Sequence, residues 1–151
     1  MHYTDLKKKI EQLLIFFRRL GSLHNLSFTD PEILRDKIIG LDIRRRKLLI
    51  VQDNNDKYDS TIIDLYEVST CKVKKMYSSI DFVSFKKNKI REYLSTIAIE
   101  FVFKNGGTPV ALVFCKDMNY PVNEMTELEY KAKNLEMMLW KILSVPKQKS
   151  A

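Results

Sequence analysis

Two regions of the chain have apolar residues spaced three or four apart, which is the spacing of an amphipathic helix. The first region predicts a helix over Asp5–Leu20, with Gly21 in the left-handed conformation that commonly ends a helix. The second predicts a helix over Thr126–Leu143, with Thr126 as its N-cap and Glu129 completing a capping box. Each helix therefore has one apolar face with which to pack on a sheet.

Between the helices, apolar and polar residues alternate in short runs, which is typical of half-buried β-strands. We predict six strands that form three consecutive antiparallel pairs. The pairs are Ile38–Arg44 with Lys47–Val51, Thr61–Val68 with Thr70–Tyr77, and Ile97–Lys104 with Val110–Cys115. Arg45-Arg46 joins the first pair. Asn105-Gly106-Gly107 joins the last, because these residues readily adopt the positive φ angles of a tight turn.

The connections divide the chain into three predicted segments. Residues 1–37 contain the N-terminal helix and a connection with one helical turn, since Asp30 and Pro31 form a typical helix start. Residues 38–145 contain the strands and the last helix, and residues 146–151 are a tail. A chain of this length is expected to form one α+β structural unit. Residues 78–95 are expected to make a surface excursion, and a seventh strand either lies there or is missing.

The order of these elements is similar to that of pleckstrin-homology-like (PH-like) domains, in which a bent antiparallel sheet of seven strands is closed by the last helix. The segments that carry the resemblance are Ile38–Val51, Ser60–Tyr77, the Asn-Gly-Gly hairpin and Glu127–Leu143, which contains the single tryptophan, Trp140. The phrases IIGLD, KLLIV and IDL–EV–CKVKK resemble bacterial PH-like proteins of uncharacterised function, notably from Bacteroidetes. The resemblance implies a six- or seven-stranded PH-like barrel with an added N-terminal helix.

The resemblance also points to the turn of the first hairpin. Family members that bind phosphoinositides use basic residues in and beside this turn. Guanidinium groups bind phosphate oxygens in pairs, and lysines add positive charge. The candidate ligand-binding residues are therefore Arg44, Arg45, Arg46, Lys47, Lys72, Lys74 and Lys75. The competing interpretation is that an exposed turn is charged because it is solvated.

Basic residues outnumber acidic ones, 26 Lys and Arg against 19 Asp and Glu, which gives a formal net charge of +7. Such an excess attracts nucleic acid, anionic lipid or an acidic protein surface. It is also ordinary for a small soluble domain. Nucleic-acid binding is the weakest of these alternatives, because the basic run at 86–91 lies among aromatic residues without a recognition motif.

The sequence gives no basis for catalysis or for metal and cofactor binding, so we predict a non-enzymatic protein without cofactors. It has no nucleophile, phosphate-loop or metalloprotease motif. His2 and His24 are not at ligand spacing with cysteines or carboxylates. Asp53–Asp56 resembles the start of a calcium loop, but Tyr58 stands where that loop requires glycine and Asp64 where it requires glutamate, so we interpret the segment as a polar hairpin loop. The two cysteines, in predicted strands, are expected to be buried.

The outer faces of the helices are candidate contact surfaces for another protein. Tyr130 and Met137 fall opposite the apolar stripe of the last helix, and Trp140 lies at the margin of that stripe. Methionine and aromatic residues are enriched in interfaces. The alternative is that Trp140 packs over the open end of the sheet and that Met137 is incidental. The N-terminal helix, whose apolar stripe is wide, is an equal candidate for a dimer contact.

We therefore predict an interaction or adaptor module that binds a protein or a second copy of itself. The alternative is binding of an anionic lipid or phosphate ligand at a membrane surface through the first hairpin, and nucleic-acid binding ranks third. We expect the chain to be cytoplasmic, or the cytoplasmic part of a longer membrane-associated protein, because the sparse cysteines indicate a reducing compartment.

Overall fold

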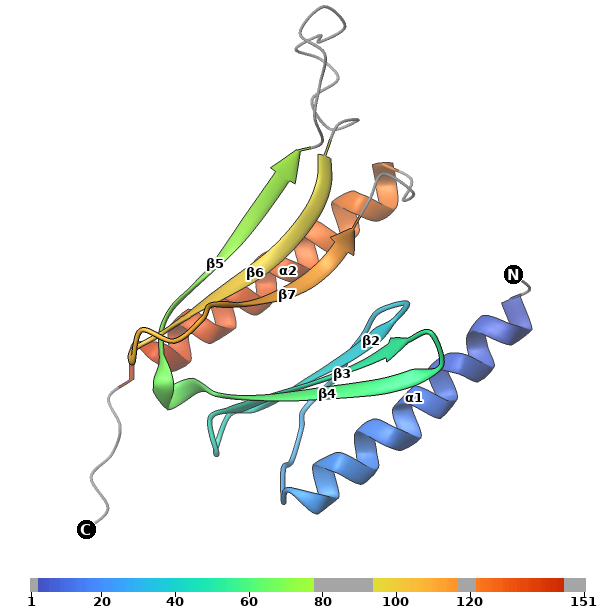
Figure 1. Ribbon diagram of the computed structural model, residues 1–151, viewed down its shortest axis with the longest axis horizontal. Coiled ribbons are helices and arrows are strands. Elements are labelled where there is room, and N and C mark those ends of the chain that lie inside the picture. The colour runs from blue at the N-terminus through green and yellow to red at the C-terminus, as the bar shows by residue number, and fades with distance from the viewer. Residues whose placement is uncertain (1–2, 78–93, 117–121, 146–151) are drawn as a thin grey trace, which may run out of the picture. The chain divides into compact units, whose positions relative to one another are not determined.

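The computed structural model describes residues 3–77, 94–116 and 122–145, and the chain divides into two compact units, Met1–Tyr66 and Glu67–Ala151. The elements are α1 (Tyr3–Leu23), β1 (Glu32–Ile33), β2 (Lys37–Asp42), β3 (Lys47–Asn54), β4 (Lys57–Asp64), the 3₁₀ turn η1 (Leu65–Glu67), β5 (Val68–Tyr77), β6 (Leu94–Phe103), β7 (Val110–Lys116) and α2 (Val122–Leu143). Each unit combines one antiparallel sheet with one long helix (Figure 1). The predicted α+β class is confirmed.

The first unit contains a four-stranded sheet with the order β1-β2-β3-β4, in which all neighbouring strands are antiparallel. α1 lies along one face of this sheet (Figure 1), because its apolar stripe meets the apolar side chains that β2 and β3 present there. The buried core of this face consists of Leu13, Phe17, Leu26, Ile38, Leu49 and Val51. Two tilted aromatic pairs, Phe17 with Phe28 and Phe16 with Tyr58, extend the core.

The end of α1 differs from the prediction. Gly21 lies inside the helix, and Asn25 takes the left-handed conformation instead, with a φ of 56°. The Leu26 N–H donates to the Gly21 carbonyl at 2.8 Å. A second hydrogen bond runs from the Asn25 N–H to the Ser22 carbonyl at 3.2 Å, and together the two form a Schellman motif. The motif turns the chain so that Leu26 enters the core.

Glycine is required at two positions by the close packing between α1, β2 and the segment that follows α1. A Cβ atom at Gly40, in the middle of β2, would lie 2.4 Å from a Phe17 ring carbon and 2.7 Å from a Phe28 ring carbon. A Cβ atom at Gly21 would lie 2.9 Å from the Phe28 ring. Phe28 therefore fits between the two glycines, and no side chain at either position is compatible with this placement of the ring.

The second unit contains a three-stranded antiparallel sheet with the order β5-β6-β7, and α2 lies along one face of it (Figure 1). The buried residues of the unit include Cys71, Ile97, Ile99, Phe101, Leu112, Leu128, Ala132 and Leu139. Ile97, Ile99 and Phe101 are thus buried as predicted for one face of β6. Phe103, predicted on the same face, is half-buried.

α2 also covers part of an edge of the second sheet. β5 is an edge strand, so the outward N–H groups of its backbone have no partner strand among the described residues. The Val73 N–H donates to the Glu136 carboxylate at 2.5 Å, and Lys75 forms an ion pair with Glu129. Burial, together with the nearby Glu136 charge, raises the pKa of the Cys71 thiol to about 11. Cys71 is therefore protonated and unreactive at neutral pH.

The predicted pairing of the middle strands is wrong. β4 begins at Lys57 and pairs with β3, while β5 pairs with β6, so the predicted hairpin between Thr61–Val68 and Thr70–Tyr77 does not form. The β3–β4 turn consists of Asn55 and Asp56, both with positive φ, in the region predicted as a polar loop. Two successive left-handed residues match the twist of a hairpin without glycine.

Two predicted element boundaries and one predicted element type also differ. α2 begins at Val122, so Thr126 lies inside the helix rather than at its N-cap, and Met125 adds one more buried residue to the apolar face. The segment after Pro31 forms strand β1 instead of a helical turn, because it pairs with β2. β2 ends at Asp42 rather than Arg44, which leaves a longer turn before β3.

The described residues contain seven strands in two sheets of four and three strands, and these strands do not form a closed barrel. The seventh strand is β1, which the sequence did not indicate. The surface excursion predicted for residues 78–95 falls almost entirely on residues 78–93, which lie outside the described residues.

Replacing Gly40 with alanine is expected to destabilise the protein by about 1–3 kcal/mol, because the added methyl group would overlap the rings of Phe17 and Phe28. The free energy of unfolding is measured by urea denaturation. The control is Ser60→Ala, at an exposed position of β4, which is expected to change it by no more than about 0.5 kcal/mol. Equal stability of the two variants would contradict the packing described for Gly40.

Candidate functional site

The basic turn predicted as a ligand site lies between β2 and β3 and consists of four residues, Ile43–Arg46, rather than two. Arg46 has a φ of 54°, so the turn closes through a left-handed residue. The Arg46 carbonyl accepts a hydrogen bond from the Leu65 N–H at 2.9 Å. The turn is therefore attached at its base to the chain segment that follows β4.

Asp42 is a buried carboxylate at the start of this turn. Its Oδ2 accepts a hydrogen bond from the Ser27 N–H and its Oδ1 one from the Arg45 N–H, both at 2.9 Å. The Arg45 guanidinium lies 3.3 Å from Oδ2. Burial alone would raise the pKa of Asp42, but these donors and the Arg45 charge outweigh it and hold the pKa below its ordinary value. Asp42 thus joins the turn to the segment after α1.

Two more of the basic residues at the turn also contact their own unit. The Arg46 guanidinium lies over the Tyr66 ring, 4.9 Å from its centroid. Lys47 Nζ lies 3.7 Å from the Asp64 carboxylate. Arg44 is exposed and has no ion pair or hydrogen bond within the described part of the chain. Of the four predicted ligand residues at this turn, Arg44 is therefore the one whose guanidinium group has no contact of this kind with the described residues.

The other predicted ligand residues, Lys72, Lys74 and Lys75, belong to β5 in the second unit. Lys72 and Lys74 share one face of β5 and Lys75 lies on the other, because side chains alternate along a strand. Lys75 points to the side that α2 covers, where it pairs with Glu129. Lys74 Nζ lies 3.2 Å from Glu100 on the opposite side, where Lys72 is also exposed. The structure therefore does not bring these three lysines into one cluster.

The predicted contact residues of α2 are exposed. Side chains of Tyr130, Met137 and Trp140 are 66%, 53% and 46% exposed, respectively. Tyr130 and Met137 are seven residues apart and so lie two turns apart on the same side of the helix, with Trp140 one turn beyond Met137. Trp140 is more than half covered, so the alternative that it packs over the end of the sheet stays a prediction.

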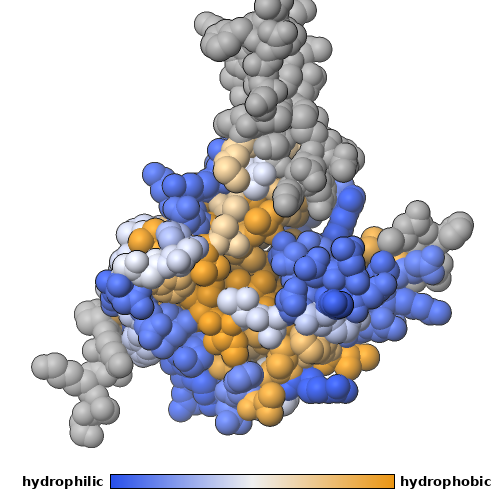
Figure 2. Space-filling view, viewed as in Figure 1, coloured by the Kyte–Doolittle hydropathy of each residue, from blue (hydrophilic) through white to orange (hydrophobic). Residues whose placement is uncertain are grey.

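Other large apolar side chains also reach the surface, and Figure 2 shows hydrophobic residues among hydrophilic ones on the visible face. Those exposed by more than 40% are Ile15, Leu23, Ile33, Ile43, Met76, Tyr130, Met137, Met138, Trp140 and Val145. Scattered exposed apolar residues are normal in proteins. α2 differs because four of these residues, Tyr130, Met137, Met138 and Trp140, lie within three turns of one helix. We refer to these four residues as the α2 outer stripe.

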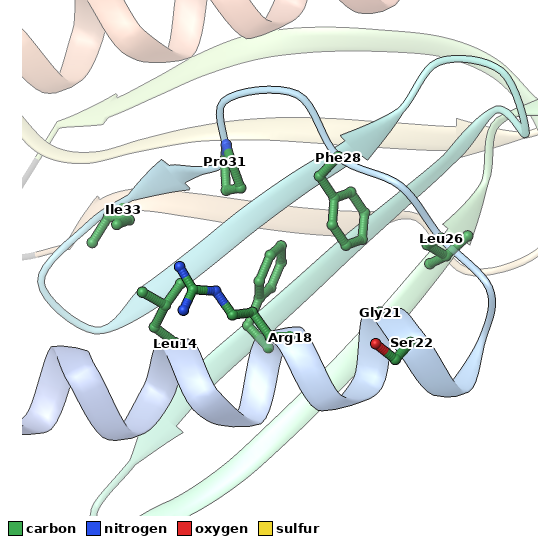
Figure 3. Close-up of a pocket in the computed structure, with 9 residues that line it drawn as sticks. Leu14, Arg18, Gly21, Ser22, Leu26, Phe28, Pro31 and Ile33 are labelled. Atoms are coloured by element: carbon green, nitrogen blue, oxygen red, sulfur yellow. The ribbon is translucent and has the colours of Figure 1, made fainter.

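A groove in the first unit was not anticipated from the sequence. It has a volume of about 540 Å³ and lies between α1 and the segment from Leu26 to Ile33 (Figure 3). Its lining is apolar apart from Arg18 and Ser22 of α1. The sequence contained an indication of it, because the segment that connects α1 to the sheet is unusually apolar. Its apolar residues are Leu26, Phe28, Pro31 and Ile33.

The described residues give little support for a metal site, a calcium loop or a reactive cysteine. No three His, Cys, Asp or Glu side chains among them are close enough together to hold a metal ion. The calcium-loop resemblance at Asp53–Asp56 corresponds to the β3–β4 turn, where Asp53 Oδ1 accepts the Asp56 N–H at 3.0 Å. Cys71 and Cys115 are both buried and are not joined by a disulfide.

Protein-family models, curated proteins and solved structures include no match to this chain. Neither described helix combines the length and the apolar character that crossing a bilayer demands. Function must therefore be inferred from the geometry of the chain itself.

Asp42→Asn is expected to lower the free energy of unfolding at pH 7 by about 1–3 kcal/mol, because the amide cannot satisfy the donors that surround it. The lowered pKa makes the Asp42 charge stabilising above its unfolded-state pKa, and this contribution is lost as the pH falls through the folded-state pKa. The difference between wild type and variant is therefore full at neutral pH and shrinks below about pH 4.

The measurement is urea denaturation from pH 7 down to the acid limit of folding. Asp59→Asn, at an exposed carboxylate of β4, serves as the control and is expected to have little effect. A stability difference for Asp42→Asn that stays constant across this pH range would show that the buried charge does not stabilise the turn.

Proposed function

We propose that the protein is a non-enzymatic, cytoplasmic interaction module that associates with a second copy of itself through the α2 outer stripe. The observation that carries the proposal is the exposure of Tyr130, Met137 and Trp140 on one helix whose opposite face is packed on the sheet. Aromatic and methionine side chains are enriched in interface cores, and a methionine sulfur packs favourably against an aromatic ring. The stripe supplies both partners of such a contact.

The charges beside the stripe support a second copy as the partner. Glu127, on the N-terminal half of α2, is 67% exposed, and Lys141, on the C-terminal half, is also exposed. The two residues are 14 positions apart, close to four helical turns, so both lie near the same side as Tyr130. Lys131 and Lys133 also lie on the N-terminal half, and Lys131 Nζ is 3.8 Å from Glu127 in the same helix. The complementarity therefore rests on two positions: Glu127 near one end of the face and Lys141 near the other match the same two residues of a face in reversed direction.

An antiparallel pair of α2 helices centred on Asn134 satisfies this complementarity. Glu127 of each copy then faces Lys141 of the other, and Tyr130 of each copy lies at the level of Met138 of the other. Such a contact is isologous, so each favourable pair occurs twice. A contact made by one helix from each copy is smaller than about 1,200 Å², a size typical of weak and transient association.

For the fold, we propose a PH-like arrangement. It is supported by the seven strands and by the helix α2 that follows the last strand and packs on one of the sheets. Anion binding at the basic turn receives no specific support, because Arg45, Arg46 and Lys47 contact Asp42, Tyr66 and Asp64.

Met137→Gln is expected to weaken self-association by about fivefold or more, corresponding to about 1 kcal/mol, because it removes an apolar side chain from the centre of the contact. The measurement is sedimentation equilibrium over protein concentrations from about 10 µM to about 1 mM, a range suited to a weak dimer. Emission of the single tryptophan, Trp140, reports burial of the stripe on association.

Met76→Gln is the matched control. Met76 is 55% exposed, nearly as much as Met137, but lies on β5 of the same unit, away from α2. It is expected to associate like the wild type. A wild-type chain that stays monomeric throughout this range would contradict self-association, and equal weakening by both variants would contradict the assignment to α2.

A further inference from the structure

The groove between α1 and the 26–33 segment is built by the first unit alone, so it is separate from the α2 outer stripe. Its volume of about 540 Å³ lies within the range of about 300–1,000 Å³ that is typical of small-molecule sites. The groove is partly open to solvent, and apolar side chains form most of its lining.

The inner surface of the groove is held in place by tight packing. Phe28 is fixed between Gly21 and Gly40 and contacts Phe17, with the two ring centroids 4.8 Å apart. Leu26 is fixed by the Schellman motif that ends α1. A ligand entering the groove therefore meets a preformed apolar surface, which reduces the ordering cost of binding.

One charged side chain lines the groove. Arg18 extends along it toward Leu14 (Figure 3) and is exposed, with no ion pair or hydrogen bond within the described residues. A guanidinium group donates two parallel hydrogen bonds to a carboxylate, a geometry that lysine cannot reproduce. Because Arg18 is the one cation among the described residues that line the groove, the charge of the groove matches an anion of charge −1 better than a phosphate monoester, which carries nearly two negative charges at pH 7.

We propose that this groove binds an amphiphile with one alkyl chain and a terminal carboxylate. The alkyl chain lies against Phe28, Leu26 and neighbouring apolar residues, and the carboxylate pairs with Arg18. Ser22, on the same helix one turn further along, provides a hydroxyl at the rim. This activity is additional to self-association and uses none of the residues of the α2 outer stripe.

The test uses decanoate as the probe, kept below its micelle-forming concentration and titrated into the full chain by isothermal calorimetry. We expect saturable binding of one decanoate per chain. Arg18→Gln is expected to weaken it by about tenfold or more, because a charge-assisted pair is lost. Arg19→Gln is the matched control. Arg19 is the next residue of α1 and is also exposed, but it does not line the groove, so its variant is expected to bind like the wild type.

Three further arms test the site and the chemistry of the ligand. Ser22→Trp, at an exposed helix position, is expected to fill the groove and abolish binding while circular dichroism shows an unchanged fold. Neutral decanol is expected to bind at least about tenfold more weakly than decanoate, and decyl phosphate no more tightly than decanoate.

The proposal is overturned by the absence of saturable binding, or by equal weakening in the Arg18→Gln and Arg19→Gln variants. It is also overturned if decanol binds as tightly as decanoate, because the carboxylate then has no role. Tighter binding of decyl phosphate would assign the groove to a phosphate head group instead. None of these results depends on self-association. The Met137→Gln variant is therefore expected to bind decanoate like the wild type even if it no longer self-associates.

Discussion

The packing of Phe28 against Phe17, Gly21 and Gly40 is the constraint on which the rest of the first unit depends. It sets how closely α1 approaches β2, because a methyl group on either glycine would push the ring away. It also fixes the segment after α1, whose Ser27 N–H then reaches Asp42 at the basic turn. Through Asp42, the same packing positions Arg45, so helix, sheet and turn form one connected arrangement.

The sequence was sufficient to predict the elements with strong periodicity. Both long helices and the main strands follow from apolar spacing, because burial of one face dominates their energetics. The interpretation of Asp53–Asp56 as a polar hairpin loop is confirmed, but the pairing of β3 with β4 was missed, because the next strand was predicted to start at Thr61 and to pair with Thr70–Tyr77. The role of Gly21 was also misjudged, because a ring seven residues along the chain, rather than the local backbone, requires glycine there.

Candidate sites could be predicted where the exposure of a side chain depends only on its position in its own helix. Exposure of Tyr130, Met137 and Trp140 follows from helical spacing, and the structure shows all three exposed. The interactions of the basic turn were not predictable, since Asp42, Tyr66 and Asp64 meet it only after the sheet forms. The groove was missed for the same reason: its lining comes from a helix and a connecting segment that come together only through packing.

The antiparallel contact between two α2 helices is tested most directly by exchanging its charges. Glu127→Lys alone places like charges opposite Lys141 of the second copy, and Lys141→Glu alone places them opposite Glu127, so each variant is expected to self-associate more weakly than the wild type. A mixture of the two variants is expected to form heterodimers with near wild-type affinity by sedimentation equilibrium, because every facing pair again has opposite charges. A mixture that associates no better than either variant alone would contradict the antiparallel arrangement.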